Sequence, residues 1–256
     1  MPRTKPPFRA DHVGSLLRPA ALKAARGKRE RGEITAAELA AVEDRVIETV
    51  IRKQEDIGLR SVTDGEFRRA FWNYDFLGKL AGVEAYLGER KIKFSRARRR
   101  PADAAAHLCP HDQCGDLRRP RGHDQGDAPV PRNFQSSFVA SGGYEPVAEI
   151  LFNEIDIDAY FMEYDSDRAG GFEPLRFVPK GKMVVLGLVT SKSGTLEEKD
   201  PLKRRIEEAA KFVDLDQLCL SPQCGFASSE EGNILAEDEQ WAKLRRIVEV
   251  ADEVWR

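Results

Sequence analysis

The chain has 256 residues, of which 41% are hydrophobic and 33% are charged, and its formal net charge is -2 at pH 7. This hydrophobic share is enough for one sizeable core, most simply a single α/β domain of barrel size. The near-zero net charge argues against nucleic acid or an anionic membrane as the main partner, and no apolar run approaches the roughly 20 residues that cross a bilayer.

The N-terminal part predicts a strand–helix–strand unit. Residues 11–17, "DHVGSLL", are typical of a short strand that runs into a turn. In the following helix Thr35 is placed as the N-cap, Glu38 completes the capping-box pattern, and Gly58 ends the apolar periodicity. Residues 59–67, "LRSVTDGEF", then predict a strand that ends in an acidic turn. Such a unit is the building block of parallel sheets.

The second half of the chain continues the alternation of helices and strands. Its pattern predicts, in chain order, a helix and then a strand within 142–165, a strand at 182–192, an amphipathic helix at 200–213, a strand at 216–224 and a final helix at 236–255. Polar residues at strand ends favour an α/β fold of the TIM (β/α)8-barrel type, with its site on the C-terminal face. Only about five strands are apparent where a closed barrel has eight, so we expect a barrel that lacks strands in its middle.

Residues 95–132 interrupt this pattern. They show neither helical nor strand periodicity, and Leu108, Leu117 and Val130 are their only large aliphatic residues. A segment so poor in core-forming side chains cannot offset the entropy lost on ordering. We therefore expect one domain over residues 1–256, interrupted at 95–132 by a loop or a disordered insert.

Four motifs follow one another in chain order, each near the end of an expected strand: "FRADHVGSLLRP", "SVTDGEFRR", "YFMEYD" and "LSPQCGFAS". Together they resemble the cobalamin-independent methionine synthase family, in its catalytic barrel and more closely in its short single-barrel relatives. The resemblance covers residues 8–94 and 133–256. It implies a zinc-dependent methyltransferase that moves a methyl group from 5-methyltetrahydrofolate to homocysteine. Zinc suits this chemistry, because a free thiol is mostly protonated at neutral pH and zinc deprotonates it.

The resemblance assigns roles to individual residues. Glu163 and Cys224 match two of the family's zinc ligands; by themselves they could be a solvated acid at a strand end and a buried thiol. Ser15 matches the residue that holds the homocysteine carboxylate, and Glu66 matches the acid that binds its amino group. Both could equally be ordinary turn residues.

Two neighbours of these residues, Asp64 and Trp72, are expected to line the same pocket, although the tryptophan could equally belong to the core. No catalytic residue is assigned. The acid that protonates the folate N5 atom stays open, because no histidine occurs in the strand at 182–192.

The family's other two zinc ligands, a His-x-Cys pair, should directly precede Asn133. That position instead follows "DAPVPR". Reading "GHDQGDAPVPR" one base later, with permitted codons, gives a peptide that ends in His-Leu-Cys-Arg, so residues 97–132 resemble the family's own sequence in a shifted frame. On this hypothesis His107 and Cys109 form the pattern by accident, and a block of the family's barrel is missing near residue 95.

Two rival interpretations of this stretch remain. His107, Cys109, His111 and Cys114 have the side chains of a tetrahedral zinc site, but their spacing is tighter than usual paired-ligand patterns. Its arginines could form a nucleic-acid arm, but aspartates dilute their charge and no aromatic residue is available for stacking.

Three functions follow as hypotheses: an active methionine-forming methyltransferase, a truncated or frameshifted remnant without catalysis, or a related thiol chemistry with another acceptor. The basic N-terminus lacks the apolar stretch of a signal peptide, and the chain has four cysteines, too few for a disulfide framework. We therefore expect a cytoplasmic protein with small-molecule substrates and no nucleic-acid or membrane partner. The sequence does not decide the oligomeric state.

Overall fold

The structure, a computed structural model, describes residues 3–70, 80, 83–87, 106–110, 133–134, 137–138, 142–227 and 232–255. The chain divides into two compact units. The larger unit combines Met1–Arg68 with Asp127–Arg256, and the smaller unit is Arg69–Gly126.

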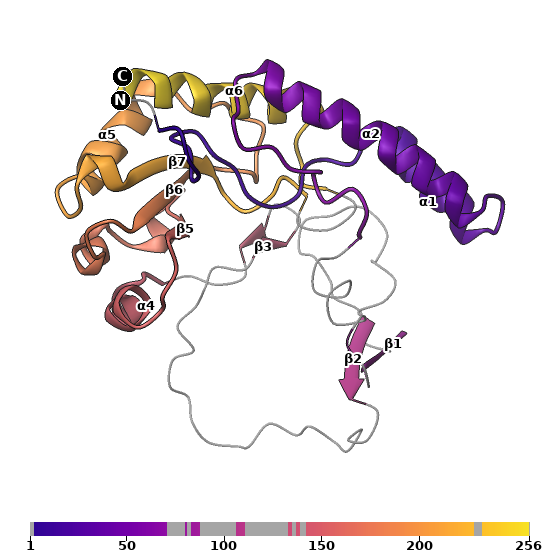
Figure 1. The fold of residues 1–256 in the computed structure, drawn as a ribbon, viewed down its shortest axis with the longest axis horizontal. Helices are drawn as coiled ribbons and strands as arrows, with labels where there is room; N and C mark the ends of the chain where they lie inside the picture. Colours follow the sequence, from indigo (N-terminus) through magenta and orange to yellow (C-terminus); the bar gives the residue numbers. More distant parts are fainter. Residues whose placement is uncertain are drawn as a thin grey trace. The chain divides into compact units, whose positions relative to one another are not determined.

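The larger unit is built from helices and a parallel sheet (Figure 1). Its α-helices are α1 (Ala20–Glu30), α2 (Ala36–Asp56), α4 (Ala148–Asn153), α5 (Lys199–Ala209) and α6 (Glu237–Val254). Its strands are β3 (Asn133–Phe134), β4 (Ser137–Phe138), β5 (Ala159–Glu163), β6 (Met183–Val189) and β7 (Leu218–Pro222). Four short 3-10 helices join them: η1 (Glu145–Val147), η2 (Asp167–Ala169), η3 (Glu173–Phe177) and η4 (Leu215–Gln217).

The three strands β5, β6 and β7 form one parallel sheet in that order, as the alternating sequence pattern predicts. Two N-terminal segments lie next to β7 and to each other without forming regular strands. Ala10 makes an isolated parallel bridge to Leu220, and the Leu16 amide donates to the Gly65 carbonyl at 3.1 Å. The expectation of strands at 11–17 and 59–67 is therefore wrong in conformation, because these segments turn before they can pair over several residues.

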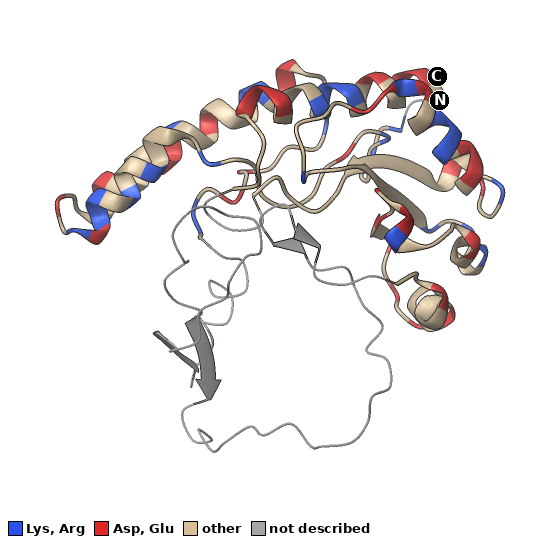
Figure 2. Cartoon of the chain, turned by 180° about the vertical axis from the view of Figure 1, so that it is seen from behind, with Lys and Arg blue, Asp and Glu red and all other residues tan. Residues whose placement is uncertain are grey.

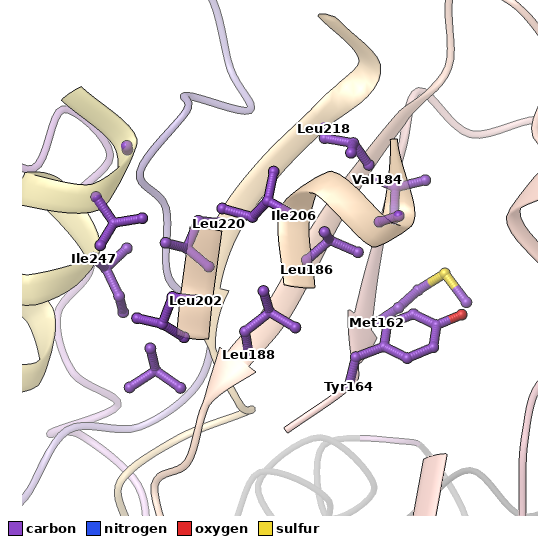
Figure 3. Close-up of a cluster of buried hydrophobic side chains, with 14 of the residues drawn as sticks. Met162, Tyr164, Val184, Leu186, Leu188, Leu202, Ile206, Leu218, Leu220 and Ile247 are labelled. Atoms are coloured by element: carbon purple, nitrogen blue, oxygen red, sulfur yellow. The ribbon is translucent and has the colours of Figure 1, made fainter. Parts of the chain in front are cut away.

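One face of the sheet packs against the helices and holds the main core (Figure 3). Leu186 from β6, Leu220 from β7 and Ile206 from α5 are each 0% exposed. Burying such a side chain contributes roughly 1.5–3 kcal/mol. Every residue of β6 is buried, which confirms the prediction from its continuous apolar run.

The opposite face of the sheet carries a second, much smaller cluster of Met183, Val185 and Cys219. Phe161 of β5 is paired in register with Val185, yet it is 44% exposed. In a closed barrel this face would be the interior, which layers of side chains fill. The face is thus only partly covered at β5.

Helix α2 begins and ends as the sequence predicts. The Thr35 hydroxyl accepts from the Glu38 amide, and the Glu38 carboxylate accepts from the Thr35 amide, which completes the capping box. Gly58, at φ 93°, ends the helix. Helix α1, which the sequence analysis missed, buries only Leu22 and Ala25, so it has almost no apolar periodicity to find.

The smaller unit contains an antiparallel pair, β1 (Val83–Leu87) with β2 (Ala106–Pro110). This differs from the expectation that 95–132 would contain no regular element. Backbone hydrogen bonds alone can form such a ladder, so the scarcity of large apolar residues does not prevent it.

Helices of the larger unit expose mixed charges. Figure 2 shows acidic and basic residues interspersed along them, as is usual for helices with one solvated face. Within the part of the chain that the structure describes, no helix is long and apolar enough to cross a membrane.

Candidate metal and substrate site

Glu163 and Cys224 meet at the C-terminal edge of the parallel sheet. Glu163 is the last residue of β5, and Cys224 lies two residues beyond the end of β7. The Cys224 thiol Sγ donates to the Glu163 carboxylate Oε1 at 2.7 Å. The two residues are 61 positions apart in sequence, so only the parallel arrangement of the strands brings them together.

The second carboxylate oxygen of Glu163 is held from the other side. Arg168 Nη2 donates to Glu163 Oε2 at 3.1 Å and to Asp165 Oδ1 at 3.0 Å. Burial raises the pKa of Asp165, and the charge of Arg168 opposes that rise. Oε1 of Glu163 is thereby aimed at Cys224 while Oε2 is engaged.

Tyr144 fixes the backbone of the same residue. Its hydroxyl accepts from the Glu163 amide at 3.0 Å and donates to the Glu163 carbonyl at 3.4 Å. Burial raises the pKa of this hydroxyl to about 12, so it stays protonated at neutral pH. Both the backbone and the carboxylate of Glu163 are thus held in place.

The thiol of Cys224 is protonated at neutral pH. The residue reaches the surface, but the protein atoms around its thiol and the nearby Glu163 carboxylate raise the pKa to about 12. Lys192 follows β6 at the same edge; burial lowers its pKa to about 8, and the charges of Cys224 and Glu163 oppose that fall. A thiolate at Cys224 therefore needs a further cation close by.

The Glu163–Cys224 pair has the donor types that zinc prefers, one thiolate sulfur and one carboxylate oxygen. The two donor atoms lie 2.7 Å apart at one strand edge, so both would face the same bound ion. Within the described residues, no three His, Cys, Asp or Glu side chains are grouped closely enough to hold a metal. The pair fits zinc in donor type and would supply two of the four ligands of a tetrahedral site.

Ser15 lies against the loop that carries Cys224. A Cβ atom on Gly14 would come within 2.8 Å of the Gly225 backbone nitrogen, and one on Gly225 would come within 2.7 Å of Ser15 Oγ. Both glycines have positive φ, which other residues rarely adopt. The Ser15 hydroxyl donates to the Ala227 carbonyl at 2.5 Å. The absence of two side chains is what lets the Ser15 and Cys224 loops touch.

Asp64 and Glu66 stand on a tight turn next to Ser15. Asp64 Oδ1 accepts from the Glu66 amide at 2.9 Å. Arg18, which is 5% exposed, donates to the Glu66 carbonyl at 3.5 Å and to the Ala227 carbonyl at 3.3 Å. Arg18 therefore joins the turn of Glu66 to the segment that Ser15 contacts.

The structure thus brings together Glu163 with Cys224, and Ser15 with the Cys224 loop. Trp72 lies outside the described residues. His107 and Cys109 lie on β2 in the smaller unit, where only the backbone is described. Their expected roles stay predictions.

Sequence reasoning missed four residues at this edge: Tyr144, Asp165, Arg168 and Lys192. Asp165 and Lys192 stand at the ends of predicted strand segments and Arg168 lies three residues beyond the first of these, where polar residues commonly serve a site. That signal was available for Asp165, Arg168 and Lys192. Tyr144 precedes a helix, and its position in the sequence carried no such signal.

Comparison with known proteins places this fold and site in a family. Residues 144–253, which include Glu163 and Cys224, match the model described as "Cobalamin-independent synthase, Catalytic domain". The uncharacterized protein YxjH of Bacillus subtilis (strain 168) is 37% identical, over 98% of this chain and 96% of that protein.

Two solved structures are similar as well. A putative vitamin-B12-independent methionine synthase from Listeria monocytogenes is 30% identical, with TM-score 0.67 and 98% coverage of both chains. A B12-independent methionine synthase from Shewanella sp. W3-18-1, in complex with selenomethionine, has TM-score 0.66 at 14% identity, over 96% of this chain and 97% of that one, and shows likeness of fold. The class is therefore the TIM-barrel type of methionine synthase catalytic domain. The chain belongs to the cobalamin-independent methionine synthase family, whose enzymes are of the methyltransferase kind.

The match with YxjH also shows a difference in length. The alignment spans 361 positions and includes 98% of the 256 residues of this chain, about 251, so about 110 positions have no residue here. Since 98% of this chain and 96% of the relative are covered, the difference lies within the chain.

Proposed function

We propose that the chain is a zinc-dependent methyltransferase that takes a methyl group from 5-methyltetrahydrofolate, including its polyglutamate forms, and gives it to homocysteine, forming methionine in the cytoplasm. The observation that carries the proposal is the contact between Glu163 and Cys224 at the strand ends of a family member. Homocysteine has three groups to bind, and each finds a counterpart among the residues at this edge.

In this proposal Glu163 and Cys224 hold the zinc ion, and Arg168 keeps one Glu163 oxygen turned away from it. When bound, zinc supplies the positive charge that keeps the substrate thiol deprotonated and nucleophilic. The Ser15 hydroxyl turns from the Ala227 carbonyl, to which it donates in the structure, and donates instead to the substrate carboxylate, while the Glu66 carboxylate accepts from the ammonium group. Asp64 and Trp72 line the remaining space.

Metal content and turnover test this function together. Purified protein with added zinc should hold one ion per chain by elemental analysis and form methionine from homocysteine and 5-methyltetrahydrofolate. Zinc in stoichiometric amount without methionine formation, but with methylation of another thiol from a substrate panel, would replace homocysteine by a different acceptor. If the purified protein holds no zinc and shows no turnover, the proposal is overturned.

A non-catalytic remnant is the second candidate, and the alignment favours it. About 110 of the 361 aligned positions have no counterpart in this chain, because the alignment includes only about 251 of its residues, 98% of 256. An interior deletion of that size would remove barrel strands, and the 44% exposure of Phe161 on the inner face agrees with that. Such a chain would hold zinc poorly, because the His-x-Cys pair expected before Asn133 is missing.

The nucleotide sequence of codons 95–133 distinguishes the two candidates. A shifted frame that encodes His-Leu-Cys-Arg directly before Asn133 would support the remnant. If no reading frame of these codons encodes that peptide, the frameshift explanation fails, and the methyltransferase with ligands from elsewhere in the chain gains support.

A further inference from the structure

The turn that carries Asp64 and Glu66 has an unfavourable backbone. Glu66 has φ 60° and follows Gly65 at φ 65°. Among the residues that the structure describes, Glu66 is the only non-glycine residue with positive φ. Non-glycine residues rarely adopt this strained conformation, and those that do gather at functional sites where surrounding contacts hold them. The turn therefore needs surrounding contacts that hold Glu66 in this conformation.

Gln54, from the last turn of α2, clamps the start of the turn. Its side chain is 0% exposed. Nε2 donates to the Thr63 carbonyl at 2.8 Å, and Oε1 accepts from the Thr63 amide at 2.9 Å. Because a backbone amide only donates and a carbonyl only accepts, this pair of bonds fixes which end of the Gln54 amide is oxygen. The side chain thus bonds to Thr63 as a neighbouring strand would.

His12 completes the set of bonds to the same amide. His12 Nε2 lies 2.7 Å from Gln54 Oε1, and Gln54 Nε2 also donates to the Val50 carbonyl at 2.9 Å. Since Oε1 can only accept, His12 must donate from Nε2, so its neutral form is the Nε2–H tautomer. All four hydrogen-bonding positions of the Gln54 amide are occupied.

Gln54 therefore joins the segment that carries Ser15 to the turn that carries Glu66. His12 lies three residues before Ser15, and Thr63 lies three residues before Glu66. The 63–67 turn then contacts the Ser15 segment directly through the bond from the Leu16 amide to the Gly65 carbonyl. A shift of the Gln54 amide would move both segments.

We propose that Gln54, with His12, is a positioning residue that holds Glu66 in its left-handed conformation, so that the Glu66 carboxylate receives the ammonium group of an amino-acid substrate. The inference rests on the proposed function. Gln54 itself does not touch the substrate; it acts through Glu66.

A double-mutant cycle tests this dependence. Q54M keeps the length of the side chain but removes its hydrogen bonds, and it should weaken binding of L-homocysteine, measured by calorimetry, by about 10-fold. In an E66Q background the same change should weaken binding by less than about 2-fold, because coupled residues are not additive. Equal losses in both backgrounds, or none in either, would overturn the proposal.

Q217M is the matched control. Gln217 is also buried, and its Nε2 donates to the Pro179 and Lys182 carbonyls, both at 2.8 Å, at the opposite end of the strands. It should cost similar stability in thermal unfolding and leave homocysteine affinity unchanged. If Q54M does not fold, His12→Phe removes one bond to the same amide, and the same cycle with E66Q applies, with about a 3-fold loss expected.

Hydrogen exchange separates this inference from the proposed function. If the wild-type chain does not bind homocysteine, the proposed function fails by that result alone. The positioning of the turn is then decided by backbone amides: faster exchange confined to residues 63–67 in Q54M supports it, and unchanged exchange there overturns it.

Discussion

Glu163 ends one regular parallel strand and Cys224 follows another, whereas Ser15 and Glu66 stand on turns held by side-chain hydrogen bonds and close glycine contacts. We call the first pair the metal half of the site and the second pair the substrate half. In the metal half, the sheet's backbone ladder sets the positions. In the substrate half, single residues such as Gln54 and Gly14 do so. The two halves should therefore fail in different ways.

The largest expected effect is in the metal half. C224S replaces a thiolate donor by a poor zinc ligand, and it should lower zinc affinity by more than about 100-fold, since even the partners of ligands commonly cost 10–100-fold. Competition with a chromophoric chelator measures this. C219S, at the buried thiol outside the site, is the control and should retain zinc. Equal affinity in C224S and wild type would remove Cys224 from the metal site.

The ladder of the metal half depends on the core behind it. L186A empties a fully buried position between the sheet and the helices, and it should lower the free energy of unfolding by about 2–5 kcal/mol. Urea denaturation gives the value. I150A, at a 59% exposed residue of α4, is the comparison and should change stability little. Similar values for the two would contradict the position of the core.

Gly14 tests the contact between the two halves. G14A places a Cβ atom 2.8 Å from the Gly225 nitrogen at φ 87°, and it should cost about 1–3 kcal/mol through backbone strain. Thermal unfolding measures the loss. Gly32 has φ 74° but open space around it, so G32A isolates the effect of φ, and the excess in G14A is the steric part. No excess would mean that the loops are not pressed together.

The smallest effect is the pH dependence of the substrate half. Burial lowers the pKa of His12 below 6.5, so unfolding takes up a proton when the pH falls below that value. Stability should therefore decrease as the pH falls from about 6.5 towards the lowered pKa, by at most ~1.4 kcal/mol per pH unit. Burial raises the pKa of Asp11, so this group makes stability fall as the pH rises from 3.8 to its raised pKa, which is opposite to the effect of His12.

Urea midpoints measured from pH 7.5 to 5 would show the His12 slope. His12→Phe should abolish it, because phenylalanine takes up no proton. A slope that persists unchanged in this variant would mean that another group is responsible.

The same contrast explains what could be predicted from sequence. Apolar runs and helical periodicity identified β5, β6, β7 and α2, and the family resemblance then singled out Glu163 and Cys224 near two of the strand ends. Periodicity carries no information on a turn that a distant side chain holds, so the roles of Gln54 and Gly225 were not visible. Helix α1 was missed for a related reason, because it buries only two residues.

Tyr144 has a consequence for assembly as well as for the site. Its hydroxyl bonds both the amide and the carbonyl of Glu163 on the side of β5 away from β6. A sheet edge normally recruits further strands through such free groups, within one chain or between chains. Here the backbone of the strand's last residue is already satisfied, so the addition of a further strand would have to stop short of Glu163.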